Sequence, residues 1–232
     1  MGNAVSDCRR IYGRLWDEAV SAFERSELDF DHHLRNKDKD LRRGLTLLFR
    51  PSSEVKAVIG KFLKQLADVA PQQYFYRPEE FHTTVLAIIP GSESWQEKFQ
   101  HLPAYQAIID NVLKKHRPFS IHFQGVTASR GGVMIQGFLG DDTLEKIRDD
   151  LREAMRQNNF GGQLDVRYKI NAAHITVMRF REAEADWKRV LELLKVNRAA
   201  NFGEARVENL ELVLGDWYAS ANTARTIQKF SL

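Results

Sequence analysis

Two short motifs carry the residue types that acid–base chemistry needs. His82-Thr83-Thr84-Val85 and His174-Ile175-Thr176-Val177 lie 92 residues apart, and in each a threonine follows a histidine by two positions. Displacement at the phosphorus of a phosphodiester needs a base for the attacking oxygen and an acid for the leaving oxygen. Two imidazoles suit both roles, because an ordinary pKa of about 6.5 lets one ring be neutral while the other is protonated. We therefore predict His82 and His174 as the acid–base pair.

The threonines of the two motifs have a separate predicted role. Residues two apart on a strand point to the same face, so Thr84 lies beside His82 and Thr176 lies beside His174. A hydroxyl can donate a hydrogen bond to a non-bridging phosphate oxygen, where negative charge must be held through the transition state. We predict that Thr84 and Thr176 bind phosphate.

The motifs belong to a longer internal repeat. Residues 76–95 and 168–187 align without gaps and are identical at five positions, the pairs being Tyr76/Tyr168, His82/His174, Thr84/Thr176, Val85/Val177 and Trp95/Trp187. A random alignment of this length would give about one identity at ordinary composition. A duplicated strand–helix unit explains the match. If the two units pack about a pseudo-twofold axis, the two imidazoles face one shared groove.

Other charged and aromatic residues near the motifs are candidates for substrate binding. Tyr76 and Tyr168 can stack a nucleobase or pack at equivalent points of the repeat. Arg77 and Lys169 agree in charge and can attract phosphate. Strict alternation along the second motif strand places Arg179 on the face opposite His174, so Arg179 is not predicted as a phosphate ligand.

Each candidate also has a purely structural interpretation. A lone histidine on a strand is more often a packing residue than a catalyst, and only the duplication favours catalysis here. Threonine is also a good strand residue in its own right. Trp95 and Trp187 are predicted to belong to the core. His32 and His33 lack a further ligand pair nearby, so no metal site is predicted there.

The composition excludes several classes of protein. The chain has 232 residues, of which 43 % are hydrophobic and 28 % charged, and its net charge is +3. These values are typical of a globular protein and too weakly basic to announce nucleic-acid binding by bulk charge. Cys8 is the single cysteine, which excludes an intrachain disulfide and a cysteine-based metal site.

No segment of the sequence is suited to the membrane. The first twenty residues are too charged for a signal peptide, and no apolar run has the length of a membrane span. Met1-Gly2-Asn3-Ala4-Val5-Ser6 fits the N-myristoylation pattern, which short sequences satisfy easily, so lipidation is not predicted. We expect a cytoplasmic monomer without a membrane partner.

The pattern of predicted elements indicates an α+β fold. Helices are predicted near 4–25, 53–66, 105–115, 142–158 and 183–196, and strands near 44–49, 81–89, 119–127, 133–139, 173–180, 210–214 and 226–230. The strands 119–127 and 133–139 form a hairpin, so the sheets should be largely antiparallel or mixed. Residues 29–43 are charged, without apolar periodicity, and are predicted to be a loop. We divide the chain into an N-terminal helix and charged loop, 1–43, and a main domain, 44–232.

The paired His-x-Thr motifs, at this spacing and on predicted strands, resemble those of the 2H phosphoesterase superfamily. The preceding tract, Tyr76 to Phe81, also resembles its bacterial 2'-5' RNA ligase and cyclic phosphodiesterase branch. The resemblance covers roughly 44–232. It implies a bilobal fold with pseudo-twofold duplication, in which two mostly antiparallel sheets flanked by helices surround a central cleft. It also implies metal-independent chemistry, without a cofactor, on 2',3'-cyclic phosphates or 2'-5' linkages.

The sequence thus predicts a 2H-type phosphodiesterase that acts on a nucleotide or RNA-end phosphodiester, with a pH profile that is bell-shaped around neutrality. One alternative is a non-catalytic module that binds a nucleotide or RNA end in the same cleft. A zinc hydrolase is less favoured, because such sites need three protein ligands and no carboxylate recurs at a fixed offset from both motifs. The exact substrate, the reaction direction, and which histidine is acid and which is base stay open at this stage.

Overall fold

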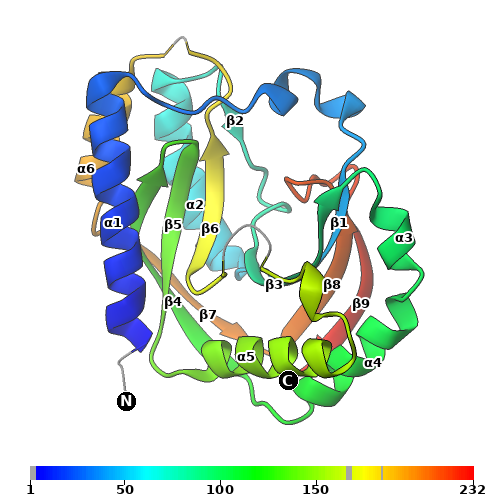
Figure 1. The fold of residues 1–232 in the computed structure, drawn as a ribbon. Helices are drawn as coiled ribbons and strands as arrows, with labels where there is room; N and C mark the ends of the chain where they lie inside the picture. The colour runs from blue at the N-terminus through cyan, green and yellow to red at the C-terminus, as the bar shows by residue number, and fades with distance from the viewer. Residues whose placement is uncertain (1–3, 166–168, 184) are drawn as a thin grey trace.

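The strands form two antiparallel sheets, as a computed structural model that describes residues 4–165, 169–183 and 185–232 shows (Figure 1). The first sheet has the order β3-β1-β8-β9 and comprises β3 (Thr83–Ser92), β1 (Arg43–Phe49), β8 (Asn209–Gly215) and β9 (Arg225–Ser231). The second sheet has the order β2-β6-β5-β4-β7 and comprises β2 (Tyr74–Phe75), β6 (Ala173–Arg179), β5 (Gly132–Leu139), β4 (Phe119–Ser129) and β7 (Asn201–Val207). The antiparallel α+β fold predicted from the sequence is confirmed, whereas β2 and β7 were not predicted.

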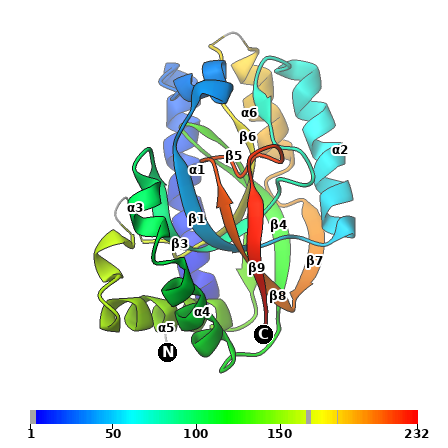
Figure 2. The ribbon, with the colours of Figure 1, turned by 90° about the vertical axis from the view of Figure 1, so that its right-hand side faces the viewer.

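Two helices pack on the sheet opposite to the one that contains the strand before them (Figures 1 and 2). The second sheet is contacted by α1 (Ala4–Arg25) and α2 (Ser53–Val69), and α6 (Trp187–Val196) packs against both of these helices. The first sheet is contacted by α3 (Trp95–Phe99), α4 (Leu102–Leu113) and α5 (Thr143–Gln157). Yet α2 follows β1 of the first sheet, and α5 follows β5 of the second. This exchange gives both sheets one continuous hydrophobic core.

Local sequence explains how the exchanged helix α2 forms. Ser52 caps it, accepting a hydrogen bond from Val55 N at 3.4 Å, which satisfies one of the amides that a helix start leaves unpaired. Its buried residues recur at helical spacing, so a single apolar stripe faces the second sheet; they are Val55, Ile59, Phe62, Leu63 and Leu66.

The N-terminal helix α1 packs on the second sheet and is hydrogen-bonded to it. Tyr12 is fully buried, and its hydroxyl donates to Gly137 O at 3.2 Å and accepts from Gly137 N at 3.3 Å and Ala173 N at 3.0 Å. Thr127 Oγ1 donates in return to Tyr12 O at 3.1 Å. These bonds fix the start of β6, one residue before His174, against α1.

The segment between α1 and β1 contains a 3-10 helix, His32–Lys39, where the sequence predicted a loop. Asp31 caps this helix by accepting from His33 N at 3.2 Å, and a second short 3-10 helix covers Gly161–Gln163. Gly2, on which the myristoylation pattern depends, lies outside the described residues. Within the part of the chain that is described, every helix is too short or too polar to cross a membrane.

We expect Tyr12→Phe to lower the free energy of unfolding by about 1–3 kcal/mol, because a buried hydroxyl with three backbone partners is lost. Urea denaturation monitored by circular dichroism measures this. Arg14→Ala, on the exposed face of the same helix, should change stability by no more than about 0.5 kcal/mol. Equal stability of wild type and Tyr12→Phe would contradict this role of Tyr12.

Candidate active site

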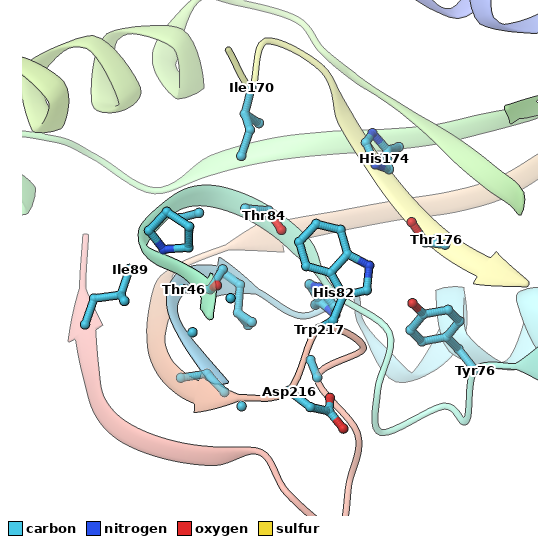
Figure 3. Close-up of a pocket in the computed structure, with 18 of the residues that line it drawn as sticks. Thr46, Tyr76, His82, Thr84, Ile89, Ile170, His174, Thr176, Asp216 and Trp217 are labelled. Carbon is cyan, nitrogen blue, oxygen red and sulfur yellow. The ribbon is translucent and has the colours of Figure 1, made fainter. Parts of the chain in front are cut away.

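The two predicted motifs meet in one pocket between the sheets (Figure 3). His82 immediately precedes β3 and Thr84 is its second residue, while His174 and Thr176 lie on β6. All four side chains line the pocket. Since β3 and β6 belong to different sheets, each sheet contributes one histidine and one threonine.

The same irregularity follows the threonine in both motif strands. The pairing of β1 with β3 passes from Leu48↔Thr84 to Leu47↔Leu86 and skips Val85. The pairing of β5 with β6 passes from Met134↔Thr176 to Val133↔Met178 and skips Val177. A β-bulge of this kind puts two consecutive residues toward the core and reverses the alternation beyond them.

The bulge in β6 corrects the prediction for Arg179. Strict alternation would turn this side chain away from His174, but Val177 and Met178 are both fully buried, so Arg179 returns to the pocket face and lines the pocket. The prediction that it lies on the opposite face is therefore wrong. Its Nε donates to Tyr76 Oη at 3.0 Å. The equivalent position in the first motif is Ala87, which also lines the pocket.

A backbone carbonyl orients the ring of His82. Its Nδ1 lies 2.7 Å from Glu80 O, and because a carbonyl only accepts, Nδ1 carries the hydrogen and the neutral ring presents a bare Nε2. The Glu80 carboxylate holds this turn by accepting from Arg77 N at 2.9 Å and Ala221 N at 3.0 Å. Burial lowers the pKa of His82 below 6.5, against the opposing effect of the Glu80 carbonyl.

His174 lies in a different electrostatic environment. Burial, with the nearby cations Arg148 and Arg179, lowers the pKa of His174 to about 4. Its Nδ1 is buried and has no hydrogen-bond partner among the described residues. The charge on either histidine also disfavours charge on the other. Both pKa values therefore favour neutral rings at neutral pH.

The remaining candidates from the sequence have different positions. Tyr76 is buried and lines the pocket, whereas Arg77 and Lys169 are exposed and lie outside its lining. Lys169 pairs instead with Asp149 at 3.5 Å. Tyr168 falls outside the described residues.

The two repeated tryptophans lie away from the pocket lining. Trp95 begins α3 and Trp187 begins α6. Both pack partly buried against the core, in agreement with the structural interpretation of the sequence.

The sequence did not identify the part of the pocket that the C-terminal strands supply. Asp216, Trp217 and Ala219, on the loop after β8, line it together with β1 residues such as Gly44 and Thr46. They have no counterpart in the repeat. The glycine at position 44 is one clue in the sequence to this part of the pocket. A Cβ there would lie 2.8 Å from Ile89 O, so only glycine permits this close approach of β1 and β3.

The described residues contain no group of three or more histidine, cysteine or carboxylate side chains placed to hold a metal ion. The polar side chains that line the pocket include the two motif imidazoles, the two motif hydroxyls and the guanidinium of Arg179.

Comparison with known proteins identifies the class. The family model for the AKAP7 2'5' RNA ligase-like domain matches residues 50–221, which include both motifs and the pocket loop. Together with the fold, this places the chain in the 2H phosphoesterase superfamily, as the sequence motifs predicted. The chain belongs to the AKAP7 2'5' RNA ligase-like domain family. No curated protein sequence matches it.

Solved structures share the fold at low sequence identity. TT0787 of Thermus thermophilus is 18 % identical with a TM-score of 0.62, and the match covers 82 % of this chain and 97 % of that one. LigT of E. coli complexed with 3'-AMP is 13 % identical with a TM-score of 0.55, covering 82 % and 98 %. A crystal structure described as a phosphoesterase is 14 % identical with a TM-score of 0.55, covering 82 % and 98 %.

Titration of the histidine rings tests the electrostatics of the pocket. We expect the His174 resonances to titrate with a midpoint near 4, since burial and two cations disfavour the charged ring. NMR of 13C-labelled histidine, with His174→Asn for assignment, measures this. Removing one cation in Arg179→Gln should raise the midpoint. A wild-type midpoint at or above the ordinary 6.5 would contradict the environment described.

Proposed function

We propose that this protein is a phosphodiesterase that acts on a nucleotide or RNA-end phosphodiester, a 2',3'-cyclic phosphate or a 2'-5' linkage, by general acid–base catalysis with two histidines. The observation that carries the proposal is the convergence of two His-x-Thr pairs and one arginine on a single pocket. The family match and the LigT-like fold support the same class of reaction.

The pocket supplies the groups that hydrolysis of a cyclic phosphate needs. One histidine removes a proton from water as its oxygen bonds to phosphorus, and the other gives a proton to the ribose oxygen as the phosphorus–oxygen bond breaks. Thr84, Thr176 and Arg179 hold the non-bridging oxygens, where hydroxyl and guanidinium donors stabilise the developing charge. In this mechanism no step requires a metal ion or a cofactor.

The environments of the two rings favour one assignment of roles in hydrolysis. Arg179 disfavours the protonated form of both rings, and Arg148 adds to this effect at His174, whose pKa falls to about 4. His174 is therefore suited to be the base. The Glu80 carbonyl favours the protonated form of His82. A bound phosphate anion raises the pKa of both rings, because an opposite charge stabilises the imidazolium. His82 is therefore proposed as the acid, protonated once substrate is bound.

A non-catalytic module that binds a nucleotide or RNA end in this cleft remains the alternative to be tested. Phosphate binding alone would be served by Arg179 and the hydroxyls. It would not need a neutral imidazole from each sheet beside the same anion. The alternative predicts saturable binding without product.

We expect His82→Ala and His174→Ala each to lower kcat by about 10²- to 10⁴-fold, because each removes one proton-transfer group. The assay is turnover of 2',3'-cyclic mononucleotides and 2'-5' and 3'-5' dinucleotides in EDTA. His122→Ala, a strand histidine outside the pocket lining, should retain wild-type activity. Wild-type turnover by either pocket variant would refute the proposal, and binding without product by the wild type would favour the alternative.

A substrate with a better leaving group distinguishes the acid role of His82 from the base role of His174. A nucleoside 2'-(4-nitrophenyl phosphate) expels nitrophenolate without protonation, so His82→Ala should lose little activity on it, whereas His174→Ala should lose as much as before. Equal losses for the two variants on this substrate would contradict the assignment.

The lowered pKa values place the optimum of kcat/KM on the acidic side. Activity falls below about pH 4 as His174 gains a proton and falls above the pKa of His82, which lies below 6.5. The profile for kcat/KM reports the free enzyme, so we expect its maximum between these values, lower than the neutral optimum predicted from the sequence. Initial rates from pH 3.5 to 8 measure this. An optimum of kcat/KM above pH 7 would contradict it.

A further inference from the structure

The segment between α1 and β1, residues 26–42, lies outside the region matched by the family model and crosses above the two sheets in Figure 1. It is tied to the second sheet, because Asp31 N donates to Phe180 O at 2.8 Å, directly after β6. Asp29 N donates to Arg130 O at 2.8 Å, and Leu34 is buried in the core. The segment therefore has a fixed position relative to Arg179 at the end of β6.

The same segment holds the pocket loop 216–221 through Tyr218. The Tyr218 hydroxyl donates to Asp31 Oδ2 at 2.9 Å, and Lys37 Nζ lies 5.3 Å from the centre of the Tyr218 ring. Lys37 Nζ also lies 2.6 Å from Tyr74 Oη, and the Tyr74 and Tyr218 rings are 5.6 Å apart. Asp31 and Lys37 of the segment thus both contact Tyr218, which is fully buried.

Tyr218 lies in the sequence between two residues that line the pocket, Trp217 and Ala219. Ala219 has φ +51°, a left-handed conformation that is unfavourable for a residue with a Cβ and persists where the surroundings impose it. Asp216 supports the loop from one side by accepting from the amides of Tyr218 and Ser220. The contacts from Asp31 and Lys37 supply the support from the other side.

Trp217 connects this loop to the groups that would bind phosphate. The centre of its ring lies 5.9 Å from the Arg179 guanidinium, and Trp217 lines the same pocket as His82 (Figure 3). A large aromatic face in this position can pack on the base or ribose of a nucleotide whose phosphate lies between the histidines. Displacement of the loop would therefore weaken binding without removing a proton-transfer group.

We propose that Asp31 and Lys37 are positioning residues of the substrate site, which hold Tyr218 so that Trp217 stays in the pocket wall and contributes to nucleotide affinity. These two residues, which lie before the region matched by the family model, then support the binding site of this chain. The choice of a nucleotide as the ligand rests on the function proposed above. The claim about the position of Trp217 does not depend on whether the protein turns over a substrate.

The variants Tyr218→Phe and Lys37→Met test this proposal. The first removes one hydroxyl from a buried ring, and the second removes a half-buried cation, so both should fold. Arg35→Met is the matched control, because Arg35 lies on the same 3-10 helix but pairs with Glu182 at 3.0 Å. Thermal melts establish that each variant is folded before it is compared.

Two readouts separate positioning from stability. The 19F spectrum of protein labelled with 5-fluorotryptophan, assigned by Trp217→Phe, reports the environment of Trp217. Titration with 3'-AMP gives a dissociation constant whether or not the protein turns over substrate. We expect both test variants to move the Trp217 resonance and to raise the dissociation constant and KM about 5- to 10-fold, with kcat within about twofold. Arg35→Met should change none of these.

An unmoved Trp217 resonance in both test variants would overturn the proposal, as would a moved resonance with unchanged affinity. Wild type that does not bind 3'-AMP overturns the role in nucleotide affinity. Wild type that binds 3'-AMP but turns over no phosphodiester would refute the phosphodiesterase function while leaving this proposal supported by affinity and spectrum.

Discussion

The arrangement of the candidate site depends on one buried guanidinium. Arg148 of α5 is 1 % exposed and donates to carbonyls at both motifs: Nη2 to Thr84 O at 2.8 Å and to Ala172 O, directly before β6, at 2.9 Å, and Nε to Val85 O at 3.1 Å. Its Nη1 is buried and has no hydrogen-bond partner among the described residues. Because a buried charge is costly unless it is paired, the three carbonyls that Nη2 and Nε reach must stay around it. The same cation lies close enough to His174 to lower its pKa. Arg148 therefore links the spacing of the two motifs to the pKa of His174.

The two motif strands share a bulge but differ in chemistry. Both strands bulge after the threonine, so position 87 and position 179 face the pocket, but only the second carries a guanidinium. His82 has a carbonyl partner at Nδ1, whereas the Nδ1 of His174 has none among the described residues. A symmetric pair of rings would not separate acid from base. The departures from symmetry supply the difference in environment that distinct roles require.

The four motif residues of the candidate site could be predicted from the sequence because the motif occurs twice. The repeat identified His82, Thr84, His174 and Thr176, and period-two alternation placed each threonine beside its histidine. Alternation failed at Arg179, because a bulge leaves no signature in local propensity and shows only in the pairing with the neighbouring strand. The short strand β2 escaped notice for a related reason, since Tyr74–Phe75 is too short to carry a pattern.

From the sequence alone, one could predict which side chains are able to move protons, their pairing by repetition, and the antiparallel α+β scaffold that presents them. The environment of these side chains required the three-dimensional structure. Three features join residues that are distant along the chain: the packing of α2 and α5 on the opposite sheets, the effect of Arg148 on His174, and the lining of the pocket by Trp217. Such contacts depend on how faces pack and where a buried charge finds its acceptors, which local periodicity does not encode.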